Sequence, residues 1–350
     1  MNTPFPSNSL VDMRSDTVTR PTPEMLEAMM IADVGDDVFG DDPTVNRLQS
    51  TVADLLGKEA ALYVPSGTMG NQLALRAQTR PGDQIVLEDG AHIYRYEAGA
   101  PAALCGLLVT CVETPDGLLD WTRVEAALNP DNVHCAPPGM VSLENTHNRA
   151  GGRILPQKDV QEISDQVHAR GVRVHLDGAR LWHAHVATGL TLAELAAPVD
   201  SVSVCFSKAL GAPVGSMLAA DRATIAQAHR FRKMWGGGMR QAGILAAACL
   251  YALDHNLARL AEDHEHARVL AAGLDHPALK VNHPVDTNIV IIDVEGPGQD
   301  EALLGHLENS GVLGVGFGPG RVRLVPHLEH SDADIGHAVE ALNSFAGDRS

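Results

Sequence analysis

Short apolar runs alternate with amphipathic stretches through most of the first 254 residues. The apolar runs span about four to eight residues, as buried strands do, whereas the stretches between them repeat apolar positions every three to four residues, as helices do. The runs predicted as strands are residues 60–64, 83–89, 106–113, 139–146, 172–177 and 201–206. This alternation of strands and helices predicts a mostly parallel sheet that is covered by helices on both faces.

The predicted helices begin at recognisable signals. Proline is well tolerated in the first helical turn, so Pro23 marks the start of one helix, which continues through Ile31. Thr44 follows a polar, glycine-containing loop and is expected to cap a second helix that ends near Leu56. The other helices predicted in this part of the chain are residues 68–79, 119–128 and 156–171.

The pattern changes after about residue 254, where helices become longer relative to the strands. Helices are predicted over residues 256–274, 300–312 and 331–345, and strands over residues 287–294 and 321–327. This segment is large enough for a small α/β unit of its own. We therefore predict an N-terminal arm (residues 1–20), a large domain (residues 21–254) and a small C-terminal domain (residues 255–350).

Charge narrows the choice of partners. The 350 residues include 44 acidic and 26 basic side chains, which gives a formal net charge of −18. An acidic chain disfavours nucleic acid and anionic membranes as partners. It does not disfavour a small anionic ligand, because backbone N–H groups at a helix N-terminus bind anions locally.

Other classes of protein are disfavoured by what the sequence lacks. It has no run of about 18 apolar residues, as a membrane span needs, and residues 1–10 lack the basic start and apolar run of a signal peptide. A cytoplasmic protein is therefore expected. The five cysteines are scattered without a CxxC pair, and no HExxH occurs, so no metal site is predicted.

Three predicted strands end in turns that carry candidate chemistry. Ligands of open α/β sheets bind beyond the carboxyl ends of the strands, so these turns are expected to meet. Ser66, Gly67 and Thr68 open a helix and offer N–H and hydroxyl donors to a phosphate. Asp177 ends one apolar strand and Lys208 follows another. Each signal alone also fits a helix cap or a lysine that extends to solvent.

The combination of these turns is more specific than its parts. A phosphate cradle, a carboxylate and a buried lysine are the groups that the phosphate, the ring nitrogen and the aldehyde of pyridoxal 5′-phosphate (PLP) each require. A lysine in a dry pocket also reacts more readily with an aldehyde. The sequence therefore predicts a PLP site at this edge of the sheet.

The chain resembles the L-threonine aldolases of PLP fold type I, which are related to the aromatic β-eliminating lyases. The resemblance runs from about residue 13 to residue 330. It is carried by the segments RSDTVTRPTPEM, VGDDVFGDDPTVNRL, VPSGTMGN, SLENTHNRAGG, HLDGARLW, SVSVCFSKALGAPVGSML, KMWGGGMRQAGILAAA and RVRLVPH. It implies a large domain with a mostly parallel seven-stranded sheet, flanked by helices, and a smaller C-terminal α/β domain.

The resemblance implies roles for matching residues. For the cofactor, these are Lys208 as the Schiff-base lysine, Asp177 beside the pyridine nitrogen, Arg180 near the ring oxygen, His92 stacked on the ring, and Ser66, Gly67 and Thr68 at the phosphate. For the substrate carboxylate they are Ser15, Arg323 and again Arg180. Lys233 and Arg240 would reach the phosphate of a neighbouring subunit, which implies a homo-oligomer, a dimer or a tetramer built as a dimer of dimers.

The implied reaction is the retro-aldol cleavage of L-threonine, L-allo-threonine and related β-hydroxy-α-amino acids to glycine and an aldehyde. His92 and His134 are the candidates for the base that removes the hydroxyl proton. Phe39 stands where the resemblance leads us to expect tyrosine, so any role of that hydroxyl is absent here.

Other readings stay open at this point. The same frame also suits β-elimination, racemisation or transamination. A non-catalytic PLP carrier would not need the carboxylate-binding arginines, and a dinucleotide-dependent dehydrogenase is disfavoured because no GxGxxG follows the early strands.

Overall fold

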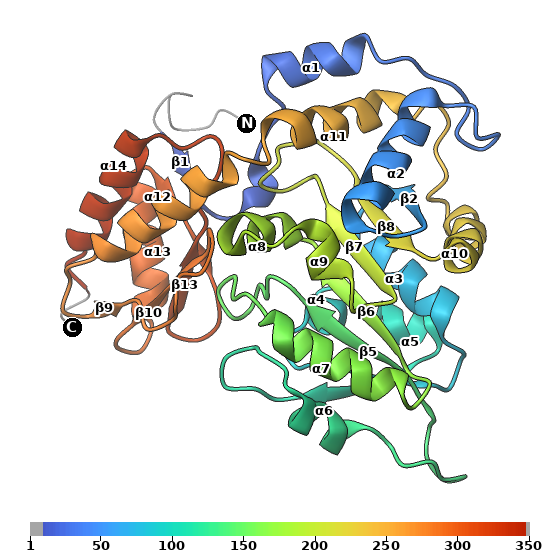
Figure 1. Cartoon of the computed structure of the whole chain (residues 1–350). Coiled ribbons are helices and arrows are strands. Elements are labelled where there is room, and N and C mark those ends of the chain that lie inside the picture. Colours follow the sequence, from blue (N-terminus) through green and yellow to red (C-terminus); the bar gives the residue numbers. More distant parts are fainter. Residues whose placement is uncertain (1–9, 348–350) are drawn as a thin grey trace.

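The computed structural model describes residues 10–347, in which seven strands form one large sheet (Figure 1). The strand order is β2-β8-β7-β6-β5-β3-β4. The strands are β2 (Ala60–Val64), β3 (Gln84–Glu88), β4 (Leu108–Val112), β5 (Pro138–Glu144), β6 (Arg173–Gly178), β7 (Ser201–Cys205) and β8 (Ser216–Ala220). Strands β3 to β7 pair in parallel, while β8 runs antiparallel to both of its neighbours. The mostly parallel seven-stranded sheet is thus confirmed.

Alternate residues of each strand face opposite sides of the sheet, and both sides are covered. Tyr63, Val86 and Met217 belong to the main core on one side, whereas Leu62, Ile85 and Leu218 belong to smaller clusters on the other. Helices that contribute to the main core are α1 (Pro23–Met30), α2 (Pro43–Leu56), α6 (Trp121–Ala127), α7 (Gln157–His168), α8 (Leu181–Thr188), α9 (Leu192–Ala196) and α11 (Gly243–His255). The other side is covered by α3 (Gly67–Gln78), α4 (His92–Arg95), α5 (Ala100–Cys105) and α10 (Arg222–Met234).

The start of α2 corrects one prediction. The N-cap is Asp42, whose carboxylate accepts hydrogen bonds from the backbone N–H groups of Thr44 and Val45. Pro43 occupies the first helical position, which leaves Thr44 inside the helix. The Thr44 hydroxyl instead donates to the carbonyl of Asp33 at 2.6 Å.

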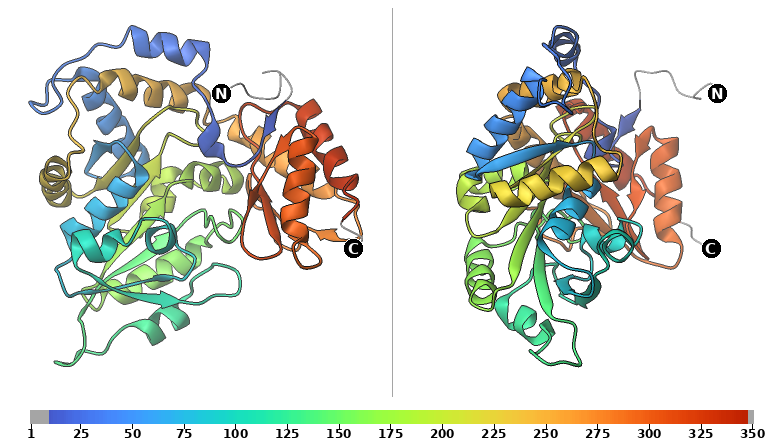
Figure 2. Two further views of the ribbon diagram at one scale, coloured as in Figure 1. Left: turned by 180° about the vertical axis from the view of Figure 1, so that it is seen from behind. Right: turned by 90° about the vertical axis from the view of Figure 1, so that its right-hand side faces the viewer.

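A smaller unit with its own core stands beside the large sheet (Figure 2). Its helices are α12 (Leu260–Ala272), α13 (Gln299–Asn309) and α14 (Asp332–Asn343). Its four-stranded antiparallel sheet has the order β12 (Val315–Gly316), β13 (Arg321–Leu324), β10 (Val290–Val294) and β9 (Leu279–Lys280). The predicted boundary after residue 254 falls at the end of α11.

The beginning of the described chain joins the small unit to the large one. Strand β1 (Val11–Asp12) pairs in parallel with β11 (Val312–Leu313), and Val11 and Met13 pack into the core of the small unit. A short 3-10 helix, Asp16–Val18, follows, and the Thr19 hydroxyl donates to the carbonyl of Lys208 at 2.8 Å. Residues 1–9 of the predicted arm lie outside the described part of the chain.

No helix in residues 10–347 combines the length and the apolar character that crossing a lipid bilayer requires.

Candidate active site

The three turns that carry the candidate cofactor-binding residues meet at the carboxyl ends of the strands of the large sheet. The strands β2, β6 and β7 all point toward this edge, which brings the start of α3, Asp177 and Lys208 around one pocket of about 170 Å³. Its lining includes Ser66, Gly67, Thr68, Asn71, His92, Asp177, Cys205 and Lys208. This arrangement follows the general rule for ligands of open α/β sheets.

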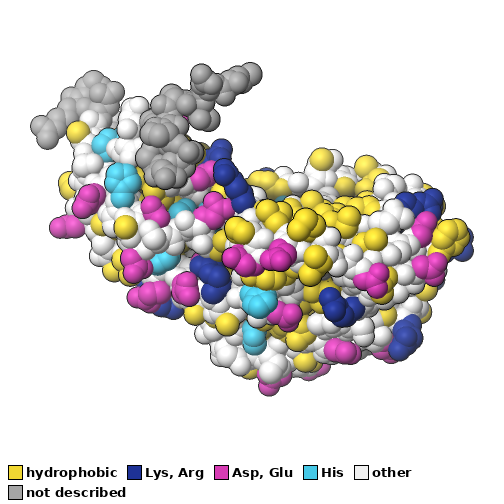
Figure 3. Space-filling view, turned by 90° about the horizontal axis from the view of Figure 1, so that it is seen from above, with side chains coloured by type: hydrophobic (Ala, Val, Ile, Leu, Met, Phe, Trp, Pro, Cys, Tyr) yellow, Lys and Arg dark blue, Asp and Glu magenta, His cyan; other side chains and the backbone are white. Residues whose placement is uncertain are grey.

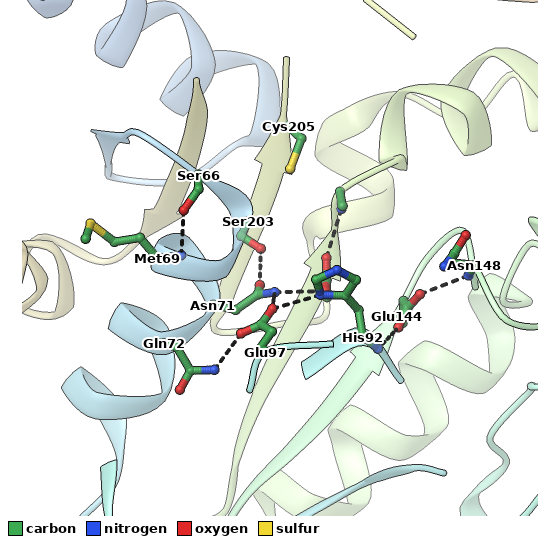
Figure 4. A network of polar contacts seen from close by, with 12 residues as sticks. Ser66, Met69, Asn71, Gln72, His92, Glu97, Glu144, Asn148, Ser203 and Cys205 are labelled. Carbon is green, nitrogen blue, oxygen red and sulfur yellow. Dashed lines mark hydrogen bonds and ion pairs between the residues drawn. The ribbon is translucent and has the colours of Figure 1, made fainter. Parts of the chain in front are cut away.

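The first turn of α3 is built to approach an anion closely. Ser66 is the N-cap, and its hydroxyl accepts a hydrogen bond from the N–H of Met69 at 3.2 Å (Figure 4). A side chain at Gly67 would bring a Cβ within 2.6 Å of Cys205 Sγ, so only glycine fits between α3 and β7. The N–H groups that remain at the helix start, together with its dipole, suit a phosphate.

Asp177 is buried at the end of β6 and has no basic side-chain partner within residues 10–347. Its two oxygens accept hydrogen bonds from the N–H of Ala179 at 3.0 Å and from Asn71 Nδ2 at 2.8 Å. A buried carboxylate is costly unless it is hydrogen-bonded or faces a cation. The site therefore fits a protonated ring nitrogen beside Asp177.

His92 lies beside the buried carboxylates of Asp177 and Glu97. Its Nδ1 lies 3.0 Å from an oxygen of Glu97, which is buried and also accepts from Asn71 and Gln72 (Figure 4). Burial alone would lower the pKa of His92. The hydrogen bond with Glu97 and the charges of Asp177 and Glu97 outweigh burial, so the pKa of His92 is raised above 6.5.

Lys208 lies in the turn that follows β7. Its Nζ is 3.7 Å from Cys205 Sγ, and no carboxylate within residues 10–347 forms an ion pair with it. Thr19 fixes its backbone, as described above. An amine without a carboxylate partner is free to bond covalently to an aldehyde.

A second pocket, of about 290 Å³, shares Thr17, His92 and Lys208 with the first. It also contains Ser15, Tyr96, Asn148, Arg149, Arg180, Phe317 and Arg323. The shared residues place this pocket directly beside the amine of Lys208. A ligand held beside this amine would extend from one pocket into the other.

Two arginines in the second pocket differ in their partners. Arg180 donates to both oxygens of Asp16 at 2.8 and 2.6 Å, and both side chains are buried. Burial would raise the pKa of Asp16, but the charge of Arg180 outweighs it and holds that pKa well below its usual range. The bidentate bond therefore fixes Arg180 in place.

Within residues 10–347, the hydrogen-bond partners of Arg323 are neutral. It donates to Asn148 Oδ1 and to the carbonyl of Arg14, both at 3.0 Å, and its buried Nε has no partner in this part of the chain. Burial, followed by the positive charge of Arg180, lowers the pKa of Arg323 to about 10. A half-buried cation with an unused donor fits a carboxylate ligand.

Comparison with known proteins identifies the family. The sequence profile of the beta-eliminating lyases matches residues 12–297. The chain belongs to this family. The low-specificity L-threonine aldolase of Escherichia coli K12 is 43% identical over 337 residues, which cover 96% of this chain and 99% of the relative. A probable low-specificity L-threonine aldolase 2 of Arabidopsis thaliana is 42% identical over 344 residues, covering 96% and 97%.

The solved structures agree on the fold of this beta-eliminating lyase family member. A threonine aldolase of Leishmania major superposes with a TM-score of 0.83 at 24% identity, and the match covers 95% of this chain and 98% of that one. The α/β architecture with a large sheet and a small unit is therefore that of PLP fold type I, as the sequence predicted.

Most of the predicted site residues of this family member lie together. The two adjoining pockets contain Ser15, Ser66, Gly67, Thr68, His92, Asp177, Arg180, Lys208 and Arg323. Arg321 alternates with Arg323 on β13 and forms an ion pair with Asp293 instead. Arg323 is therefore the arginine of β13 that lines the second pocket.

Three predicted residues are not brought to the pocket within one chain. His134 is exposed and precedes β5, so it lies at the amino end of that strand, whereas the pocket lies at the carboxyl ends. Lys233 is exposed in the last turn of α10, and Arg240 is exposed and pairs with Asp36 at 2.9 Å. Phe39, where tyrosine was expected, is 76% exposed.

Sequence reasoning missed the polar layer beneath the pocket. On β6 and β7, the apolar residues of one face alternate with His175, Asp177, Ser201 and Ser203, all of which are buried. They face α3, which contributes Asn71. Polar residues that alternate along strands of a sheet covered on both faces were the available signal, because such residues must find partners inside. Asp16, which holds Arg180, was also missed.

Proposed function

We propose that this protein is a PLP-dependent lyase that cleaves L-threonine, L-allo-threonine and related β-hydroxy-α-amino acids to glycine and an aldehyde. The observation that carries the proposal is one pair of adjoining pockets. One combines a helix N-terminus, Asp177 and Lys208, and the other contains an arginine without a carboxylate partner, Arg323. Relatives that are 43% and 42% identical over nearly their whole length are named low-specificity L-threonine aldolases.

The first pocket fits the cofactor. Backbone N–H groups from Gly67 onward, with the hydroxyl of Thr68, would hold the phosphate, and Lys208 would hold the cofactor covalently. Asp177 would keep the ring nitrogen protonated, and His92 would cover the ring. When bound, PLP supplies an electron sink that stabilises negative charge at the substrate Cα.

The second pocket would bind and orient the amino acid. Arg323 would take the carboxylate, assisted by Ser15 and by the donors of Arg180 that Asp16 does not occupy. A fixed carboxylate also fixes the rotation about the bond between Cα and the amino nitrogen. Which bond at Cα breaks depends on this rotation, and for the proposed reaction it is the bond to Cβ.

His92 is the candidate base within one chain. An ionised Glu97 has only acceptors, so the hydrogen between it and His92 belongs to His92 Nδ1. In the neutral histidine, Nε2 then keeps its lone pair. Nε2 would then accept the proton of the β-hydroxyl. His134 would have to act in the site of a neighbouring subunit, because it lies at the opposite edge of its own sheet.

We also propose a homo-oligomer, a dimer or a dimer of dimers. Large apolar side chains gather on the face that carries α1 and α11 (Figure 3), and those of α1 and the loop after it are exposed: Leu26, Met30, Ile31, Val34 and Phe39. Lys233 and Arg240 are exposed as well, so they are available to the phosphate of a second subunit.

Product analysis tests the reaction. Purified protein loaded with PLP is incubated with L-threonine, with the Lys208→Ala variant as the control. The proposal predicts equal amounts of acetaldehyde and glycine from the wild type, and a rate lower by several orders of magnitude from the variant. Ammonia with an α-keto acid would show β-elimination instead, and D-configured product would show racemisation. Either result without acetaldehyde would contradict the proposal.

A further inference from the structure

Asn71 uses every hydrogen-bonding position of its amide inside the protein. Its Nδ2 donates at 2.8 Å to an oxygen of Glu97 and at 2.8 Å to an oxygen of Asp177. Its Oδ1 lies 3.1 Å from His175 Nε2. The same oxygen accepts from the hydroxyl of Ser203 (Figure 4). All of these side chains are buried. Asn71 therefore has no donor or acceptor left for a ligand, although it lines the cofactor pocket.

The direction of these bonds is fixed by chemistry. A carboxylate only accepts, so Nδ2 must face Glu97 and Asp177, and Oδ1 must face His175. Burial lowers the pKa of His175 to about 4, so this histidine is neutral near pH 7 and carries its hydrogen on Nε2. His175 Nδ1 then accepts from Ser201, whose hydroxyl accepts from Gln78 at 2.7 Å. The chain of bonds runs one way, from Gln78 to the carboxylates.

The two carboxylates need this bridge because they are close and buried. One oxygen each of Asp177 and Glu97, and one ring nitrogen of His92, lie within 4.8 Å of one another. Like charges at such a separation repel strongly away from water. Within residues 10–347 no lysine or arginine pairs with either carboxylate. The two N–H groups of Asn71, one directed to each carboxylate, offset that repulsion.

We propose that Asn71 is a positioning residue that holds the carboxylate of Asp177 in place to face the cofactor ring nitrogen. By sharing one amide between Asp177 and Glu97, it also links the partner of the ring nitrogen to the partner of His92. This inference rests on the proposed PLP site. It assigns the control of ring protonation to a residue that does not itself contact the reacting atoms.

The neighbouring Gln72 offers a matched control. It lies on the same helix, is equally buried, and donates at 2.6 Å to the other oxygen of Glu97 without contacting Asp177. Asn71→Leu and Gln72→Leu each remove a buried amide of similar size. Only the first removes a donor from Asp177. A difference between the two variants therefore reports on Asp177 rather than on loss of packing.

The test is a ¹⁵N NMR spectrum of the full-length protein loaded with PLP that is labelled at the ring nitrogen. The wild type and Gln72→Leu are expected to show the shift of a protonated ring nitrogen. Asn71→Leu is expected to move toward the unprotonated shift at the same pH, with kcat lower by about 10- to 100-fold and a smaller change in KM. Circular dichroism checks that each variant is folded.

The outcomes separate this inference from the proposed function. A wild type that does not bind PLP would contradict the proposed function itself. An Asn71→Leu protein that binds PLP and keeps the wild-type ¹⁵N shift would overturn the role of Asn71 alone. If Asn71→Leu does not fold, Asn71→Ala removes the same donors with less steric change, and the same criterion applies to it.

Discussion

On the side of the pocket that holds Asp177, each charged group already has hydrogen-bond partners from the protein, whereas on the side that holds Arg323 one donor has none. The first, here called the ring side, comprises Asp177, Asn71, Glu97 and His92. The second, the carboxylate side, comprises Ser15, Arg180 and Arg323, and Arg323 Nε is buried without a partner.

The difference matches what each side would bind. A cofactor that stays in place requires a fixed environment, and the bonds on the ring side hold their groups in position without a ligand. A substrate must come and go. The burial of Arg323 without a carboxylate is unfavourable in the free protein, and a bound carboxylate removes this disadvantage. Binding of substrate is thereby favoured at the position that orients it.

The largest effect is expected from removing the charge on the ring side. Asp177→Asn keeps the size of the side chain but cannot stabilise a protonated ring nitrogen. We expect kcat for L-threonine to fall by about 10³-fold, as for other groups that stabilise developing charge. Steady-state kinetics with saturating PLP measures this. A variant with more than a tenth of the wild-type kcat would show that ring protonation matters little.

A smaller effect, seen mainly in KM, is expected on the carboxylate side. Arg323→Leu removes the cation that would bind the substrate carboxylate, and kcat/KM should fall by about 10²-fold. Arg321→Leu is the matched control, because Arg321 lies on the same strand and pairs with Asp293 away from the substrate. Equal losses in the two variants would argue against a specific role of Arg323.

The same comparison predicts opposite effects on stability. Asn71→Leu takes one donor from each of the buried carboxylates of Asp177 and Glu97, and should lower the free energy of unfolding by roughly 2 kcal/mol. Arg323→Leu removes a half-buried cation that has no carboxylate partner within residues 10–347, and should raise it by at most about 1 kcal/mol. Urea denaturation of the PLP-free proteins measures both. A lower free energy of unfolding in Arg323→Leu would show that the contacts of Arg323 stabilise the free protein.

The smallest effect concerns pH. Because the pKa of His92 is raised, His92 takes up a proton at a higher pH than an ordinary histidine, and a protonated His92 cannot act as the base. The rate should therefore fall as the pH is lowered through the raised value. Glu97→Gln removes the charge that contributes to this shift, so the acidic limb of kcat/KM should move to lower pH. An unmoved limb would exclude the Glu97–His92 pair as its source.

The same shift has a consequence for stability. A raised pKa in the folded state stabilises the folded protein below about 6.5, the ordinary pKa of histidine, and this contribution is lost as the pH rises through the raised value. Glu97→Gln should reduce the contribution at low pH only. Urea denaturation at two pH values, one on each side of the limb, checks this.

The positions of Lys208 and Asp177 at one end of the sheet follow from the local sequence. Lys208 follows an apolar strand directly, and Asp177 ends another, so their positions depend only on strand direction. The partners of Asn71 could not be predicted in this way, because they lie 26, 104, 106 and 132 residues away along the chain. His134 shows the converse: the same rule of strand direction would have placed it at the opposite edge.

Two other features of the fold differ from the predictions. The N-cap of α2 was assigned to Thr44, although Asp42 before Pro43 satisfies two backbone N–H groups at once. Strand β8 was not predicted because its residues, SMLAA, include no β-branched or aromatic side chain and so give a weak strand signal; its pairing with β2 and β7 reveals it.

Reduction of the PLP-loaded protein with borohydride tests directly whether Lys208 carries the cofactor. Reduction makes the bond between PLP and its lysine permanent, and mass spectrometry of the digested protein then identifies the modified peptide. We predict a pyridoxyl group on the peptide that contains Lys208. A modification at Lys233 or another lysine, or none in a protein that binds PLP, would contradict the account.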